Sequence, residues 1–211
     1  MGLPAQETDN QAEATRHEIL RAAEGLFGHY GFSKTNISDI AKECGMSPAN
    51  LYRYFRNKAA IGLAVVGGYF DMAEAAMEAE LMLPKGGAEE RVRNMMLIGV
   101  GHLVREMEVN PKIVELAEFI CSDAEGRERL FVHIHWKRDV LAREIRRGIE
   151  SGEFKPGDAD HLAHTLLLAT KVFWMPHGLA DWQDRATVLP ELTQVLDLLF
   201  SGMRASGGDG G

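Results

Sequence analysis

Residues 37–54, ISDIAKECGMSPANLYRY, constrain the fold more than any other part of the chain. Two short helices that cross closely need a small residue at the crossing, and Ala41 has that place. Four residues later, Gly45 can adopt the left-handed backbone of a tight turn. Ser47 can cap the second helix and Pro48 fits its first turn. The wedge between the helices would be filled by Ile37, Ile40, Cys44, Met46 and Leu51. This spacing predicts a helix-turn-helix.

The second helix of this pair carries polar groups that a protein core does not need. Asn50, Arg53 and Tyr54 would point outward, and so would Tyr52 if Leu51 points inward. Such a helix can lie in a major groove with its N-terminal residues at the base edges. An ordinary helical hairpin that binds nothing has the same spacing and stays an alternative.

The rest of the chain also has helical spacing, and no stretch alternates as a strand would. We therefore expect an all-α protein of about nine helices, near residues 12–30, 37–44, 48–54, 58–81, 88–107, 111–121, 125–151, 158–174 and 187–204. The expected domains are a disordered N-terminus over 1–11, a helix-turn-helix DNA-binding domain over 12–57, an effector-binding and dimerisation domain over 58–204, and a flexible tail over 205–211.

The net charge of −8 by itself argues against a nucleic-acid binder, but the charges are unevenly distributed. Residues 1–60 hold seven basic and seven acidic residues, and residues 30–60 hold five basic and two acidic ones. A locally basic end on an acidic body would bind DNA at that end only. No run of about 18 apolar residues and no signal peptide is recognisable, and Cys44 and Cys121 are interpreted as buried thiols. A cytoplasmic protein without a membrane role is expected.

Sequence motifs of common enzymes are missing: there is no Gly-x-Ser-x-Gly, no His-Glu-x-x-His and no phosphate loop. We expect neither enzymatic activity nor a cofactor, with an all-α enzyme or a helical adaptor as weak alternatives. A metal-sensing regulator is another alternative, because His161 and His164 could share a helix face. His133 and His135 are two residues apart and would not, and no Cys/Asp pattern completes a metal site.

Residues 16–61 resemble the DNA-binding domain of tetracycline-repressor (TetR) family regulators. The run LYRYFRNK at residues 51–58, followed by an apolar helix, is especially specific for that family. The resemblance covers a little over a fifth of the chain and rests on residues 19–23, 26–27, 30–32, 35, 37, 40–41, 45–47 and 51–58.

The resemblance implies roles for individual residues. Thr35, Tyr52 and Lys58 would contact phosphates. Ser38 stands where some members place a base-reading arginine and would make a shorter contact. Asn50 would suit adenine and Arg53 guanine. The full predicted DNA-binding set is Thr35, Ser38, Ser47, Pro48, Ala49, Asn50, Tyr52, Arg53, Tyr54 and Lys58. Lys42 and Arg56 are either further contacts or solvated surface charges.

The resemblance further implies a homodimeric repressor that binds a palindromic operator and is released by a small apolar or amphipathic effector. The predicted dimer interface comprises Leu162, Leu166, Leu189, Leu192, Leu196 and Leu199. The predicted effector pocket comprises Met72, Met96, Phe119, Phe131, Trp136, Phe173 and Trp174, because methionine and aromatic side chains suit an adaptable apolar pocket. Both sets have an alternative interpretation as ordinary core.

Overall fold

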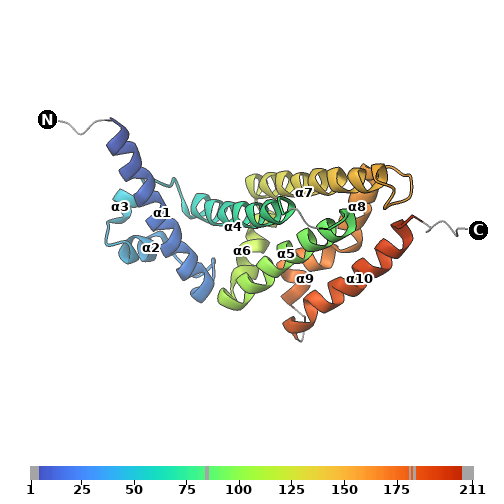
Figure 1. Cartoon of the computed structure of the whole chain (residues 1–211). Coiled ribbons are helices and arrows are strands. Elements are labelled where there is room, and N and C mark those ends of the chain that lie inside the picture. Colours follow the sequence, from blue (N-terminus) through green and yellow to red (C-terminus); the bar gives the residue numbers. More distant parts are fainter. Residues whose placement is uncertain (1–4, 84–85, 181, 183, 206–211) are drawn as a thin grey trace, which may run out of the picture. The chain divides into compact units, whose positions relative to one another are not determined.

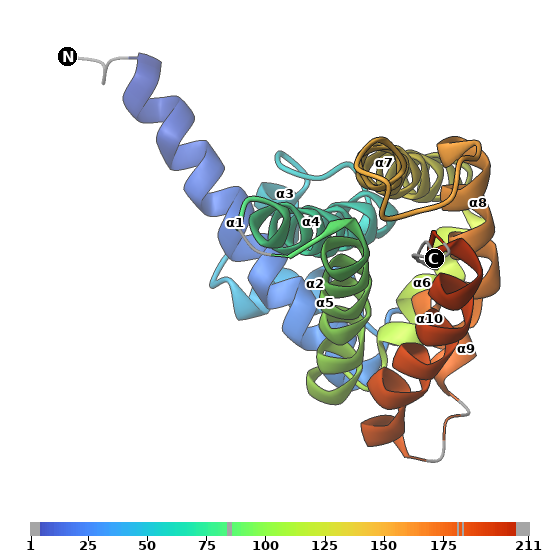
Figure 2. The ribbon, with the colours of Figure 1, turned by 45° about the vertical axis from the view of Figure 1, so that its right-hand side comes forward.

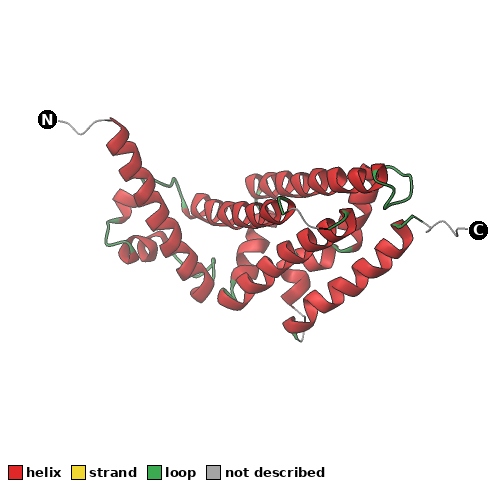
Figure 3. Ribbon diagram, viewed as in Figure 1, coloured by secondary structure: helices red, strands yellow, loops and turns green. Residues whose placement is uncertain are grey.

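The computed structural model describes residues 5–83, 86–180, 182 and 184–205, and these residues form ten α-helices and two short 3₁₀ helices (Figures 1 and 3). The helices are α1 (Ala5–Tyr30), α2 (Ile37–Glu43), α3 (Pro48–Leu51), α4 (Lys58–Leu81), α5 (Ala88–Val109), α6 (Ile113–Ser122), α7 (Ala124–Glu150), α8 (Ala159–Ala169), η1 (Lys171–Trp174), α9 (Pro176–Ala180), η2 (Arg185–Thr187) and α10 (Val188–Met203). The all-α prediction is confirmed.

Several predicted boundaries differ from the observed ones. Helix α1 begins at Ala5, so the described part of the N-terminus predicted to be disordered is helical. Residues 1–4, and residues 206–211 of the predicted tail, lie outside the described residues. The helix predicted over 158–174 ends at Ala169 and is followed by η1, and the short helix α9 was not predicted. The buried Thr170 stands at this break, where its hydroxyl donates to Leu166 O at 2.7 Å.

The chain divides into two compact units, and the first comprises Met1–Tyr69 and Glu106–Arg127. It contains α1, α2, α3, the first part of α4 and α6. The predicted domain boundary after residue 57 falls inside this unit, because α6 and the start of α4 pack with the helix-turn-helix. Phe32 stacks on Phe119 of α6 with ring centroids 4.4 Å apart. A Cβ on Gly62 of α4 would lie 2.8 Å from the Phe32 ring, so glycine permits this close packing.

The second unit comprises Phe70–Arg105 and Glu128–Gly211. Figure 2 shows α8, α9 and α10 together on one side of this unit. Its core is apolar and includes Met77, Met95, Met96, Leu141, Ile145, Leu166, Leu192, Leu196 and Phe200. The buried Glu144 carboxylate is neutralised within the unit, because it pairs with Arg91 and Arg147, each at 2.9 Å.

Among the described helices, α4 is the one that is long and apolar enough to cross a membrane by its length and composition. A core helix of a globular protein has the same properties. Leu63, Val66 and Met77 of α4 are buried by other parts of the chain. The hydropathy of α4 is therefore only a weak indication of membrane insertion.

Candidate functional site

The helix-turn-helix has the geometry that its spacing predicts. Ala41 and Leu51 are fully buried where α2 and α3 meet. Gly45 has a φ of +63°, and the backbone N–H of Met46 donates to Ala41 O at 2.9 Å. A Cβ on Gly45 would meet no atom within 4 Å, so the left-handed backbone, and not a lack of space, favours glycine at this turn.

Side-chain hydrogen bonds hold the start of α3 and the turns that follow the helix. The Ser47 hydroxyl accepts from Asn50 N at 3.2 Å, which confirms the predicted cap. Beyond Leu51 the backbone continues in turns and not in helix, so the helix predicted to reach Tyr54 is shorter than expected. There the Arg16 guanidinium donates to Tyr54 O at 2.8 Å and lies 4.0 Å over the Phe55 ring. Sequence reasoning missed this role of Arg16, since 38 residues separate it from Tyr54.

Most of the predicted DNA-binding residues have side chains in contact with solvent. Tyr52 is 53% exposed, because its neighbour Leu51 points into the core. Asn50 and Tyr54 are half-buried. The exposed members of the predicted set are Ser38, Ser47, Pro48, Ala49, Tyr52 and Arg53.

Thr35 and Lys58 are placed differently from the predicted phosphate contacts. Thr35 is 2% exposed, and its hydroxyl donates to Gly31 O at 2.9 Å. Lys58 Nζ donates to Phe32 O at 2.7 Å and to Thr35 O at 2.9 Å, and burial lowers the pKa of its ammonium group. Both polar groups are therefore used to hold the connection between α1 and α2.

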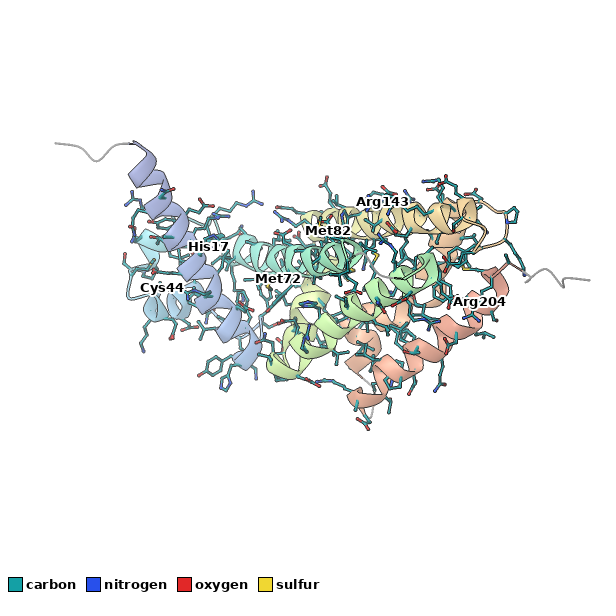
Figure 4. All side chains as sticks on the ribbon, in the orientation of Figure 1. His17, Cys44, Met72, Met82, Arg143 and Arg204 are labelled. Atoms are coloured by element: carbon teal, nitrogen blue, oxygen red, sulfur yellow. The ribbon has the colours of Figure 1, made fainter. Side chains whose placement is uncertain are left out.

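Lys42 and Arg56, which the sequence allowed to be either further DNA contacts or solvated surface charges, are both exposed. Arg56 pairs with Glu125 at 2.9 Å within the first unit, whereas Lys42 makes no ion pair with any described residue. Cys44 and Cys121 are free and half-buried, and burial raises the pKa of the Cys44 thiol, whose side chain is seen in Figure 4. The sequence predicted buried thiols, whereas both thiols are only half-buried in the structure.

The residues of the predicted effector pocket belong to both units and differ in burial. Phe119 belongs to the first unit, where it stacks on Phe32. Met72, labelled in Figure 4, and Phe131 are 51% and 59% exposed. Met96 and Phe173 are core residues of the second unit, and Trp136 and Trp174 are half-buried there.

Trp136 and Trp174 flank a polar cluster that the sequence did not predict, formed by Glu74 of α4 with His133 and Lys137 of α7. His133 Nδ1 lies 2.5 Å from Glu74 Oε1. Burial lowers the pKa of His133 to about 3, so the imidazole is neutral and its Nδ1–H donates to the carboxylate. Burial also lowers the pKa of Lys137 to about 7 and raises that of Glu74. The i, i+4 spacing of His133 and Lys137 was visible in the sequence, but the approach of Glu74 was not.

The six leucines of the predicted dimer interface differ in how deeply they are buried. Leu166, Leu192 and Leu196 are at most 2% exposed within the protomer, so they are not available to a partner. Leu162, Leu189 and Leu199 are half-buried. The exposed leucines of α8 and α10 are Leu168 and Leu198, which are 57% and 74% exposed.

The described residues contain no group of three or more His, Cys, Asp or Glu side chains that could hold a metal ion. His161 and His164, which the sequence placed on one helix face, are exposed on α8. His133 is committed to Glu74.

Comparison with known proteins finds two family models that match this chain. Residues 19–65 match "Bacterial regulatory proteins, tetR family", and residues 88–195 match "Tetracyclin repressor-like, C-terminal domain". The fatty acid metabolism regulator protein of Bacillus subtilis is 26% identical over 189 residues, covering 88% of this chain and 94% of its own length.

Solved structures share the fold. SmeT, the repressor of the Stenotrophomonas maltophilia multidrug efflux pump SmeDEF, has a TM-score of 0.69 at 21% identity and covers 93% of both chains. A transcriptional regulator from Saccharomonospora viridis in complex with choline has a TM-score of 0.70 at 21% identity, covering 92% of this chain and 100% of its own.

Proposed function

Since this chain belongs to the tetracycline-repressor (TetR) family of bacterial regulatory proteins, we propose that it binds a palindromic operator as a homodimer, represses transcription there, and is released by a small apolar or amphipathic effector. It is a helix-turn-helix transcriptional regulator and not an enzyme. We place its action in the cytoplasm, where such regulators typically meet DNA.

The solvent-exposed polar surface of α3 and of the turns that follow it is the observation that supports operator binding most directly. Tyr52 and Arg53 are exposed, while the backbone that presents them is held by Ser47 at one end and Arg16 at the other. A recognition helix needs such a fixed backbone, because base contacts depend on the direction of the side chains. Tyr52 would contact the phosphate backbone, and Arg53 and Asn50 would read base edges.

A homodimer is proposed because one short recognition helix makes few contacts. A two-fold dimer places two such helices about 34–36 Å apart, one helical turn of DNA. The exposed Leu168 of α8 and Leu198 of α10 are apolar surface that a partner can cover. Half-buried Leu162, Leu189 and Leu199 would extend that surface.

Effector binding is proposed for the second unit. The choline complex of the Saccharomonospora viridis regulator supports binding of a small molecule by this fold. In our chain, Trp136 and Trp174 of the predicted pocket lie beside His133 and Lys137, polar groups able to orient a ligand.

Selection of binding sites from a random DNA pool by the full-length protein tests operator binding. An inverted repeat should be enriched, and its affinity should fall as salt rises, because each neutralised phosphate releases counterions. Tyr52→Ala should weaken binding about tenfold, a difference of about 1.4 kcal/mol.

Tyr30→Ala is the matched control, since Tyr30 is equally exposed at 55% but lies at the C-terminal end of α1. It should bind DNA as the wild type does. Failure to enrich any sequence, or equal affinities of the two variants, would contradict the proposal.

A further inference from the structure

Lys137 is a largely buried lysine of the second unit whose ammonium group has no hydrogen-bond acceptor among the described residues. The residue is 5% exposed, and its Nζ lies 4.0 Å from the centroid of the Trp174 ring. Within the part of the chain that the structure describes, no oxygen is found at hydrogen-bonding distance from Nζ, and no carboxylate lies within 4.0 Å. The Nζ atom itself is not fully enclosed, so water reaches it and a carboxylate that displaces this water would supply the acceptor.

The nearby Glu74 carboxylate does not accept a hydrogen bond from Lys137. Glu74 attracts Lys137 electrostatically, but its Oε1 accepts from His133 at 2.5 Å. His133 is itself held between aromatic rings, with Phe70 stacked at 4.2 Å and Trp136 at 6.2 Å. The Glu74–His133 pair is therefore fixed, and the three donors of Lys137 remain for another acceptor.

The ring beneath Lys137 is fixed as well. Trp174 Nε1 donates to Thr170 Oγ1 at 3.2 Å. On α5, a Cβ at Gly99 would lie 2.7 Å from the Trp174 ring, so glycine there permits the close approach of the indole. The aromatic face holds the ammonium group by a cation–π contact, which leaves its N–H donors free for a ligand.

We propose that Lys137 anchors the carboxylate of an acidic effector, whose apolar part contacts the aromatic side chains around it, Trp136 and Trp174 above all. This assignment rests on the proposed effector role of the second unit and names the chemical class of the ligand. A single ammonium group matches a monoanionic carboxylate, whereas a phosphate dianion would require further donors. A cationic ligand would be repelled by the Lys137 ammonium group.

Matched probes with one apolar body and three head groups test the proposal. The full-length protein is titrated, without DNA, with 2-naphthoic acid, 2-naphthamide and 2-naphthylmethylamine, and with decanoic acid, decanamide and decylamine. Calorimetry should show that the acid binds at least about tenfold more tightly than its amide for one or both bodies, and that the amines bind most weakly.

Lys137→Met should abolish the preference for the acid and leave the affinity for the amide unchanged. Methionine replaces the buried lysine at similar volume, and the thermal melt of the variant verifies its folding. Lys171→Met is the control, because Lys171 is an exposed lysine of η1 in the same unit, and it should retain the preference. A crystal structure of the wild type with the tightest acid should place the carboxylate at Lys137 Nζ, whether or not the variant folds.

Three results would overturn the proposal: amides or amines that bind as tightly as acids, an acid preference that survives in Lys137→Met, or no binding of any acid at millimolar concentration. Because these titrations contain no DNA, they fail independently of operator selection. Acid binding without any enriched DNA sequence would refute the proposed operator binding alone.

Discussion

Replacing Lys58 distinguishes a residue that contacts DNA from one that holds the DNA-binding domain together. Lys58→Met removes three charge-assisted hydrogen bonds, a short pair to Phe32 O at 2.7 Å and Thr35 O at 2.9 Å and a longer one to Ser33 O at 3.4 Å. Such bonds contribute roughly 1.5–3 kcal/mol each when well shielded. Lys58 is only half-buried, so water would replace part of this, and we expect a loss of about 2 kcal/mol for the pair.

A chain of this size loses about 2–4 °C in Tm per kcal/mol, so the melting temperature of Lys58→Met should fall by about 4–8 °C. The melt is recorded by circular dichroism in the absence of DNA. Lys34→Met is the control, because Lys34 is an exposed lysine in the same α1–α2 connection, and its Tm should equal that of the wild type. If Lys58→Met kept the wild-type Tm but lost DNA affinity, Lys58 would be a phosphate ligand and our interpretation of its contacts would be refuted.

Two further changes test the backbone and the electrostatics. Gly45→Ala should lower the free energy of unfolding by about 1–2 kcal/mol, because φ is +63° there, whereas Gly68→Ala in the open middle of α4 should raise it by up to about 1 kcal/mol. Urea denaturation measures both, and equal effects would contradict the strain at Gly45. Arg204 and Arg93 lower the pKa of Glu89, so its stabilisation is present above the unfolded-state pKa and is lost as pH falls through the folded-state value. Glu89→Gln should therefore be less stable than the wild type near neutral pH and converge with it in acid; a difference that does not change with pH would argue against this.

Local sequence patterns predicted the structure correctly where the interactions that determine it lie within a few residues of one another. Gly45 and Ser47 were predicted correctly, because a left-handed turn and a helix cap depend on residues one to three positions away. The helix over 58–81 was predicted at its observed bounds. The break of the helix at Thr170 was not predicted. It accompanies tertiary packing, in which the buried Thr170 hydroxyl donates to Leu166 O and accepts from Trp174 Nε1.

The sequence by itself determined the all-helical class, the position of the helix-turn-helix and the regulator family, since these follow from periodicity and from a run of matching residues. Only the tertiary structure decided how individual polar groups are used. Thr35 and Lys58 became supports of the α1–α2 connection because the fold turns them toward backbone carbonyls. Glu74 and His133 lie 59 residues apart in the chain, yet the packing of α4 against α7 brings them together beside Lys137. No local pattern encodes such contacts, because they depend on which helix faces meet in space.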